Sequence, residues 1–553
     1  MPIKTGRYAI IEQLLKDGIT YMFGNPGTVE QGFLDALRDY PQMKYVLTLQ
    51  ESVAVLIADG YSRVTQRPGL VQLHSSPGIG NGVGALYQAK RGHAPLVVIG
   101  GDAGIRYLNM DAQMAADLVA MMEPVTKYAA VVTEPKSLLR TLRRAIKIAL
   151  TPPMGPVYLC LPMDILDSPN EEEIFPTLIP STRVIPEPGM ISQAAQMLCA
   201  AAKPMIFIGD GIAYSGASQE LTRVAELLGA EVYGVDIGDF NMDTTHPLYQ
   251  GSTGHMFGAS SLAITQKGDV NLIVGTYMLP EVFPELGDIY APGAKIIHFD
   301  LNAYEIAKNH RVDLGAVCDP KLSLAALAQA LEKIQSRQRQ DTAKQRIREI
   351  GEAKQKKIAA QLEKDIQKKT GDSVSMAEFC RVLAQKLPAD ALIFDEALTS
   401  SPEISRYLPA KNPGSYFQTR GGSLGVGIPG AIGIKLAHPE KTVVGFTGDG
   451  GSMYTIQALW SAAHQRIGAK FVICNNHNYR LLELNIQQYW KEMKIPEHAF
   501  PESFVLNNPD IDFARLAEAM GVAAIKVEKS SEISAAIDKM LKADGPFLLD
   551  LVL

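Results

Sequence analysis

Asp449 and two later asparagines combine residue types and positions that could hold a metal ion. Asp449 lies between Gly448 and Gly450 directly after an apolar run, and a later apolar run ends in Asn475 and Asn476. In a parallel sheet, a strand-helix-strand unit returns the end of its second strand beside the end of its first. A carboxylate, a side-chain amide and a nearby backbone carbonyl are hard oxygen ligands suited to Mg²⁺, which completes its shell with phosphate oxygens and water. The pattern therefore predicts that Asp449 binds a magnesium ion that binds a diphosphate.

The glycines around Asp449 favour the same interpretation. They let the backbone close on a phosphate, whose charge the N-terminus of a following helix also favours. The alternative is an ordinary turn followed by a polar strand end. A second Gly-Asp-Gly turn, at 209–211, also follows an apolar run, but no asparagine pair ends the next run. We interpret that second turn as purely structural.

Strands must position these residues, and apolar runs of strand length recur along the chain between amphipathic helical patterns. The runs are "YVLTL", "GLVQLH", "PLVVIGG", "MIFIGDG", "NLIVGTY", "KIIHFD", "KTVVGFTGDG", "KFVICNN" and "PFLLDLVL". Strands that are apolar throughout and separated by helices predict parallel sheets covered on both faces. The predicted fold class is α/β, with doubly wound parallel sheets.

Two segments interrupt this alternation and divide the chain. A stretch rich in proline and acidic residues from Asp167 is typical of an extended linker. A polar stretch from Glu332 interleaves acidic and basic residues at helical spacing, which favours a solvated linking helix over a nucleic-acid patch. We predict three α/β domains over residues 1–180, 185–335 and 370–553.

Composition narrows the class of partner. The chain has 553 residues, a net charge of -6 and five scattered cysteines, which predicts no basic surface for nucleic acid and neither a zinc site nor a disulfide framework. No run approaches the roughly 20 apolar residues of a membrane span, and the N-terminus lacks the apolar core of a signal peptide. We expect a cytoplasmic protein that acts on a small molecule, without a nucleic-acid or membrane partner.

The stretch "GDGGSMYTIQALWSAAHQRIGAKFVICNN" resembles the thiamine diphosphate motif, in which Gly-Asp-Gly is followed at a narrow spacing by Asn-Asn. The resemblance to thiamine diphosphate-dependent enzymes runs nearly end to end and is strongest to benzoylformate decarboxylases. It implies that 1–180 binds the pyrimidine ring, that 185–335 is a central Rossmann-like domain, and that 370–553 binds the diphosphate and Mg²⁺. It also implies a homodimer or homotetramer with active sites between subunits.

The resemblance carries cofactor contacts over position by position. The implied metal ligands are Asp449, Asn476 and Asn478, the last through its backbone carbonyl. The implied cofactor contacts are Asn25, Thr399, Gly422, Leu424, Gly450, Gly451, Asn476 and Tyr479. Among them, Thr399 matches a diphosphate contact, and Leu424 matches the residue that wedges the cofactor into its bent form.

Glu51 matches the carboxylate that activates the cofactor by bonding to its pyrimidine ring. In "YVLTLQESVAVLIADGYSR" it stands between a strand pattern and a helical pattern whose other residues are largely apolar. The alternative is an exposed glutamate in the first turn of a helix, where this residue type is common.

Three further residues bear on the reaction. Thr28 and His74, in "FGNPGTVEQ" and "LVQLHSSPG", match the active-site hydroxyl and histidine of benzoylformate decarboxylases, which implies carboxylate binding and proton transfer. His74 could otherwise be a structural histidine at a strand end. Gln113, in "MDAQMAADL", matches the active-site glutamine of acetolactate synthases and aldehyde lyases, unless it is merely a polar helix residue.

Several positions depart from the benzoylformate decarboxylase pattern. The segment "GTYMLPEVFPELGDIY" lacks the second histidine of that group, and the polar Asn485 stands where an aromatic residue lines its pocket. Arg480 beside it could meet an anionic substrate group or point to solvent. Asp300, at a predicted strand end, could bond to an adenosine ribose. The flavin-binding arginine run of the synthases is absent, so we do not expect FAD or ADP in the central domain.

The resemblance implies a thiamine diphosphate and Mg²⁺ dependent decarboxylase that converts a 2-oxo acid to an aldehyde and CO₂. The first alternative is a carboligase or lyase, similar to acetolactate synthases or 2-hydroxyacyl-CoA lyases and acting on acyl substrates. A second alternative is a protein that binds the cofactor without turnover, because fold alone does not establish activity.

Overall fold

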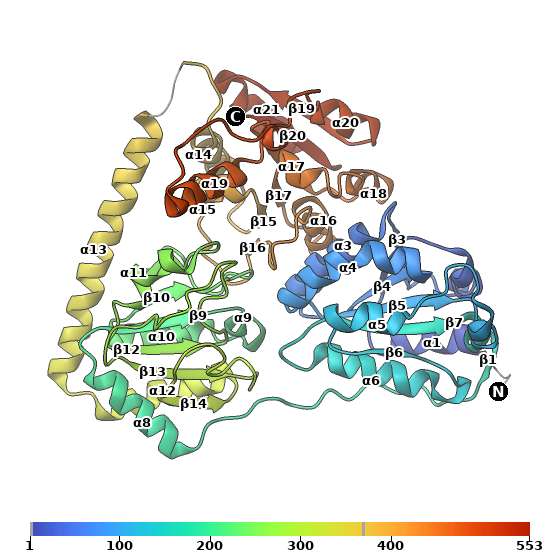
Figure 1. Cartoon of the computed structure of the whole chain (residues 1–553), viewed down its shortest axis with the longest axis horizontal. Helices are drawn as coiled ribbons and strands as arrows, with labels where there is room; N and C mark the ends of the chain where they lie inside the picture. The colour runs from blue at the N-terminus through green and yellow to red at the C-terminus, as the bar shows by residue number, and fades with distance from the viewer. Residues whose placement is uncertain (1–3, 368–370) are drawn as a thin grey trace. The chain divides into compact units, whose positions relative to one another are not determined.

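The computed structural model describes residues 4–367 and 371–553. The chain forms two compact units, one of Met1–Pro180, Lys369–Leu408 and Thr419–Leu553, the other of Ser181–Lys368 and Pro409–Gln418. Three parallel sheets with flanking helices make up these units (Figure 1). The α/β fold class with parallel sheets, predicted from the apolar runs, is confirmed.

The first sheet of the larger unit has the strand order β3-β2-β4-β5-β7-β6. Its strands are β2 (Tyr21–Gly24), β3 (Lys44–Leu47), β4 (Gly69–His74), β5 (Leu96–Asp102), β6 (Ala129–Val131) and β7 (Val157–Pro162), and all pairs are parallel. Its helices are α1 (Gly6–Lys16), α2 (Gln31–Ala36), α3 (Glu51–Thr65), α4 (Ser75–Arg91), α5 (Leu118–Met122), α6 (Leu138–Leu150) and α7 (Met163–Asp167). A short antiparallel pair, β1 (Lys4–Thr5) with β8 (Pro169–Asn170), ties the start of this region to its end.

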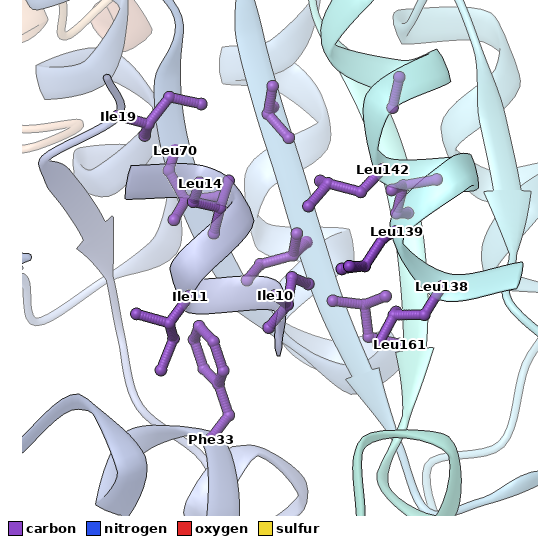
Figure 2. Close-up of a cluster of buried hydrophobic side chains, with 14 of the residues drawn as sticks. Ile10, Ile11, Leu14, Ile19, Phe33, Leu70, Leu138, Leu139, Leu142 and Leu161 are labelled. Carbon is purple, nitrogen blue, oxygen red and sulfur yellow. The ribbon is translucent and has the colours of Figure 1, made fainter. Parts of the chain in front are cut away.

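Helices α1 and α6 share one hydrophobic core with this sheet. Figure 2 shows side chains of both helices together with residues of the sheet, among them Ile10, Ile11, Leu14, Leu70, Leu138, Leu139, Leu142 and Leu161. The labelled residues of α1 and of α6 recur at helical spacing, so each helix buries one apolar stripe. This core holds the sheet whose carboxyl edge carries Glu51 and His74.

In the second sheet of the larger unit, the strands β15-β17-β18-β20-β19 run parallel in that order. Their bounds are β15 (Leu392–Glu396), β17 (Val443–Gly448), β18 (Lys470–Asn475), β19 (Ala523–Val527) and β20 (Phe547–Val552). The helices here are α14 (Met376–Lys386), α15 (Ser401–Tyr407), α16 (Gly427–Ala437), α17 (Asp449–Ser452), α18 (Ala458–His464), α19 (Arg480–Met493), α20 (Phe513–Ala519) and α21 (Ile533–Lys542).

Helices α3 and α16 cross at backbone contact and join the two sheets of this unit. A Cβ atom on Gly60 would lie 2.2 Å from the carbonyl oxygen of Gly430, and one on Gly433 would lie 2.0 Å from that of Ile57. No side chain larger than hydrogen fits at these positions. Because Glu51 begins α3 and β17 packs on α16, this crossing is part of the frame that positions both groups of predicted site residues.

The smaller unit contains the third sheet, in the order β11-β10-β9-β12-β13-β14. Its strands are β9 (Pro204–Ile208), β10 (Glu231–Gly234), β11 (Tyr249–Ser252), β12 (Val270–Val274), β13 (Lys295–Asp300) and β14 (Leu314–Val317). Its helices are α8 (Pro188–Ala200), α9 (Gly211–Ser215), α10 (Ser218–Leu228), α11 (Leu262–Thr265), α12 (Pro320–Ile334) and α13 (Arg337–Gln367). The segment β16 (Tyr416–Gln418) belongs to this unit, where Gln418 N donates to Gly238 O (2.8 Å).

The two interrupting segments have the structures predicted for them. Residues 171–187 form no helix or strand, and the polar stretch forms the long helix α13 with mostly exposed or half-buried side chains. The amphipathic stretch "SMYTIQALWSAAHQRIG" after Asp449 predicts one helix, and this prediction was wrong: the chain forms two short helices here, α17 and α18, separated by a turn at 453–457. Among the helices of the described residues, none is long and apolar enough to cross a membrane.

Candidate cofactor and catalytic site

The carboxyl ends of β17 and β18 bring Asp449 beside the asparagines, as the strand order predicted. The two strands are parallel neighbours, with Gly448 paired to Cys474. Asp449 is buried, and its Oδ2 accepts hydrogen bonds from the backbone N–H groups of Asn476 (3.1 Å) and Asn478 (3.2 Å). The turn after β18 is therefore folded around the carboxylate of Asp449.

Asn475 and Asn476 form different hydrogen bonds. The Asn475 amide is buried and donates through Nδ2 to Asp550 Oδ1 of β20 (3.0 Å), while its Oδ1 accepts from His477 N (3.3 Å). Asn476 is only partly buried, and its Oδ1 accepts from Asn478 N (3.0 Å). Asn475 thus holds the turn to the sheet, and Asn476 is the member of the pair whose amide oxygen stays at the Asp449 side of the turn.

The chemistry of this turn fits a hard cation bound to a diphosphate. Burial raises the pKa of Asp449, and backbone N–H groups of residues 450 and 476–478 lower it again. Asn478 Oδ1 is buried and accepts no hydrogen bond within the described residues, whereas the backbone carbonyl of Asn478 accepts from Arg480 N (2.9 Å). The described residues include no cluster of three His, Cys, Asp or Glu side chains that could hold a metal. One carboxylate with amide oxygens is a donor set for Mg²⁺, which takes its remaining ligands from phosphate and water.

Glycine is required next to Asp449. A Cβ on Gly450 would lie 2.3 Å from Cε1 of Tyr479, so the tyrosine ring lies directly across this residue. Gly451 follows in α17 and is buried. Gly450 therefore lets the Tyr479 ring pack closely against the backbone beside Asp449.

The other predicted diphosphate-end contacts lie on segments linked by a residue that the sequence reasoning missed. Thr399 lies in a single 3₁₀ turn, η7 (Leu398–Ser400), after β15, and Leu424 lies in the loop before α16. Gly422 in that loop is exposed and has φ +72°, which favours glycine. Glu396, the last residue of β15, is buried and accepts hydrogen bonds from the loop that contains Leu424.

Glu51 lies on the carboxyl side of the first sheet. It is the first residue of α3, and the side chain of Gln50 caps the helix by accepting from Val53 N (3.2 Å). Only 6% of Glu51 is exposed; Oε1 accepts from Asn25 Nδ2 (3.1 Å) and Oε2 from Asn81 Nδ2 (3.0 Å). The alternative of an exposed first-turn glutamate is wrong. Asn25, predicted to contact the cofactor, donates to the predicted catalytic carboxylate.

His74 ends β4 and pairs with a buried carboxylate that sequence reasoning also missed. Its Nδ1 lies 2.8 Å from Oε2 of Glu30, whose Oε1 accepts from Gly101 N (2.9 Å). Burial raises the pKa of Glu30, and the contact with His74 lowers it again. A Cβ on Gly27 would lie 2.0 Å from the His74 ring, so the imidazole packs on bare backbone. With Nδ1 engaged, Nε2 is the ring nitrogen that can meet a substrate.

Thr28 and Gln113 lie on segments that meet the same end of β4. Thr28 is exposed and opens the 3₁₀ turn η1 (Thr28–Glu30), two residues before Glu30. Gln113 is exposed and lies in a turn between η3 (Ile105–Met110) and α5, so the alternative of a helix residue is wrong. The next carbonyl, of Met114, accepts from Ser76 Oγ (2.8 Å) near the start of α4.

Two residues with open interpretations have partners of their own. Arg480 Nη1 donates a hydrogen bond to Oε2 of Glu483. Asn478 Nδ2 donates to Oε1 of the same carboxylate. Asp300 ends β13 as predicted; its Oδ1 accepts from Asn302 N (2.6 Å), and burial raises its pKa to about 7. The role of Arg480 toward substrate, and the expectation of no nucleotide at Asp300, stay predictions.

The chain is similar to known proteins along most of its length. Family models of the thiamine pyrophosphate enzymes match in three parts: the N-terminal TPP binding domain over residues 4–121, the central domain over 191–327 and the C-terminal TPP binding domain over 399–551. The chain is 30% identical to a probable acetolactate synthase large subunit of Methanocaldococcus jannaschii, over 99% of this chain and 92% of that protein. It is 29% identical to benzoylformate decarboxylase of Pseudomonas aeruginosa, over 99% and 98%.

A solved structure shares the fold over the full length. The Rhodococcus jostii RHA1 thiamine diphosphate-dependent 4-hydroxybenzoylformate decarboxylase superposes with a TM-score of 0.86 at 26% identity, covering 99% of each chain.

Proposed function

Since the chain belongs to the thiamine pyrophosphate enzyme family, we propose that it is a non-oxidative decarboxylase of a 2-oxo acid that yields an aldehyde and CO₂. The observation that carries this choice is His74 at the end of β4, with Nδ1 held by Glu30, so that Nε2 would be the ring nitrogen that meets the substrate. Similarity to benzoylformate decarboxylase and to 4-hydroxybenzoylformate decarboxylase supports the same reaction class.

The proposed cofactor site combines the two groups of residues described above, with the first-domain group from one subunit and the third-domain group from another. Asp449, Asn476 and Asn478 would hold Mg²⁺, and Gly450, Gly451, Tyr479, Thr399, Gly422 and Leu424 would line thiamine diphosphate, with Asn25 and Glu51 at its pyrimidine ring. When bound, thiamine diphosphate supplies the electron sink for cleaving the bond between the carboxylate carbon and the keto carbon.

The chain's own groups would divide the remaining work. Glu51 would hold or release a proton at one of its carboxylate oxygens, which Asn25 and Asn81 hold in place. Thr28 would donate a hydrogen bond from its hydroxyl to the substrate carboxylate, and His74 would move protons through Nε2. Because the segment "GTYMLPEVFPELGDIY" lacks the second histidine of benzoylformate decarboxylases, the His74 ring would serve both protonation and deprotonation.

We further propose the domain roles 1–180 for the pyrimidine ring, 185–335 for the central domain and 370–553 for the diphosphate. In the proposed assembly, the first domain of one subunit meets the third domain of another, in a dimer or tetramer.

The pairing of Glu30 with His74 yields a first prediction. Glu30→Gln weakens the hold on Nδ1, and we expect kcat to fall by about 10- to 100-fold, a loss like that on removing a residue that orients a metal-bound imidazole. The KM and the cofactor affinity should change by less than about threefold. Steady-state kinetics and calorimetric titration of the cofactor measure the three quantities.

Two controls show whether Glu30 acts through His74. Glu172→Gln changes a mostly buried carboxylate of the same region, which accepts from Leu139 N (2.7 Å) at the start of α6, and should leave kcat unchanged. In a His74→Ala background, Glu30→Gln should lower kcat little further. Full additivity of the two losses would contradict the positioning role.

A second candidate function is a carboligase or lyase that joins or splits acyl groups. Its support is Gln113, which is exposed on the turn held against the start of α4, together with the similarity to acetolactate synthase large subunits.

One assay separates these functions. Release of CO₂ is measured from a panel of aromatic, branched, short and dicarboxylic 2-oxo acids, with thiamine diphosphate and Mg²⁺, and each reaction is repeated with an added aldehyde acceptor. We expect release without the acceptor. Release only with the acceptor, or from no acid in the panel, would favour the carboligase or lyase and direct the search to acyl-CoA substrates.

A further inference from the structure

The carboxylate of Glu396 joins three segments at the carboxyl edge of the second sheet. Its Oε1 accepts from Gly425 N, and its Oε2 accepts from Gly427 N (2.6 Å) and from Thr447 Oγ1 (3.0 Å). The residue is 1% exposed. It therefore links the end of β15, the loop before α16 and the end of β17 through hydrogen bonds that no water screens.

Each linked segment leads to a predicted cofactor contact. Leu424 immediately precedes Gly425, Thr447 lies two residues before Asp449, and Thr399 follows three residues after Glu396 itself. The loop with Leu424 and the turn with Asp449 are thus tied to one another through a single side chain. The other carboxylate of this strand end, Asp395, bonds elsewhere: its Oδ1 accepts from Ala397 N (2.9 Å) and Ser401 Oγ (2.8 Å).

The donors around Glu396 suit a carboxylate and no other side chain of its size. Burial raises the pKa of Glu396 to about 7, and N–H groups of residues 425–427 with the Thr447 hydroxyl oppose that rise. In a glutamine, an NH₂ group would replace one oxygen and would face the backbone N–H of Gly425 or Gly427, which cannot rotate away. Space is also closed: a Cβ on Gly427 would lie 3.0 Å from Oε2 and 2.5 Å from Phe446 O.

We propose that Glu396 is a positioning residue, which holds Leu424 at a set place relative to the Asp449 turn so that the site is shaped for the bent cofactor before it binds. The inference rests on the proposed function, because it assigns Leu424 to the wedge under thiamine diphosphate. Preorganisation of this kind raises affinity by removing the ordering cost from binding.

The test compares two ligands that share the diphosphate. Calorimetry measures the Kd of thiamine diphosphate and of inorganic diphosphate, each with Mg²⁺, for the full-length protein and for Glu396→Gln. We expect the variant to bind thiamine diphosphate about 10- to 100-fold more weakly, the usual effect of losing hydrogen bonds to a buried charge. Inorganic diphosphate lacks the thiamine part that Leu424 is proposed to contact, so its Kd should change by less than about threefold.

A double-variant cycle shows whether the loss passes through Leu424. Leu424→Ala should weaken the binding of thiamine diphosphate but not of inorganic diphosphate. Adding Glu396→Gln to Leu424→Ala should weaken the binding of thiamine diphosphate little further. If Glu396→Gln does not fold, Thr447→Val removes one donor to Oε2 at nearly constant volume and enters the same cycle, with a smaller loss in the same direction.

The outcomes separate this inference from the function on which it rests. Equal losses for both ligands, no loss for either, or full additivity with Leu424→Ala would overturn the role of Glu396 while leaving the cofactor assignment intact. Failure of the wild-type protein to bind thiamine diphosphate would overturn the proposed function and this inference with it.

Discussion

Glu51→Gln should lower kcat by about 10²- to 10⁴-fold, the range that a positioned proton-transfer group contributes. The amide cannot take up or release the proton that the carboxylate is proposed to exchange with the cofactor ring. Its shape is the same, and Asn25 and Asn81 can still bond to its oxygen or, after an amide flip, to its nitrogen. Steady-state rates on the best 2-oxo acid from the panel measure the loss.

Cofactor binding separates a chemical effect from a structural one. We expect the Kd of thiamine diphosphate with Mg²⁺ to change by less than about fivefold in Glu51→Gln, because Asp449 and the diphosphate contacts are untouched. Glu51→Asp keeps the carboxylate at a shorter reach and should recover part of the rate. A wild-type protein without turnover, and a variant indistinguishable from it, would identify the chain as a cofactor binder. A variant with full activity would remove Glu51 from the mechanism.

Asp449→Asn should weaken Mg²⁺-dependent binding of thiamine diphosphate by about 100-fold or more, and activity at ordinary cofactor concentrations should be lost. Losing a residue that only hydrogen-bonds to a metal ligand lowers metal affinity by about 10- to 100-fold, and losing a direct ligand should lower it at least as much. The amide also loses the charge that attracts the cation and the acceptor strength that folds Asn476 and Asn478 around Oδ2. Titration of the cofactor at several Mg²⁺ concentrations measures the loss.

The chain carries its own matched control for this variant. Asp210 stands in the other Gly-Asp-Gly turn, is also buried, and also accepts backbone hydrogen bonds, from Gly238 N (2.9 Å) and Asp239 N (3.1 Å). Asp210→Asn makes the same chemical change in the smaller unit, and we expect it to leave cofactor affinity within about threefold of wild type. Comparable losses in the two variants would show that Asp449 acts on stability in general and not on the cation.

The sheet architecture could be predicted because its signal is local. Strands such as "KTVVGFTGDG" and "KFVICNN" are apolar on both faces, and only parallel strands covered by helices bury both. The adjacency of Asp449 and Asn476 then follows from the geometry of one strand-helix-strand unit, without knowledge of other contacts. The break between α17 and α18 was missed because an amphipathic pattern continues across the turn at 453–457.

The side-chain contacts between segments far apart in the sequence could not be predicted, because they depend on which distant residues share a buried space. Nothing near Glu30 in the sequence marks it as the partner of His74, and nothing near Glu396 marks it as the acceptor for residues 425 and 427. A buried carboxylate is tolerated only where several donors converge, and those donors come from strands and loops far apart in the chain. The sequence by itself determined the fold class, the family and the end of the sheet where the chemistry lies. Only the tertiary structure decided which carboxylates hold the histidine and the loops in place, since burial and donor geometry exist only after the segments have packed.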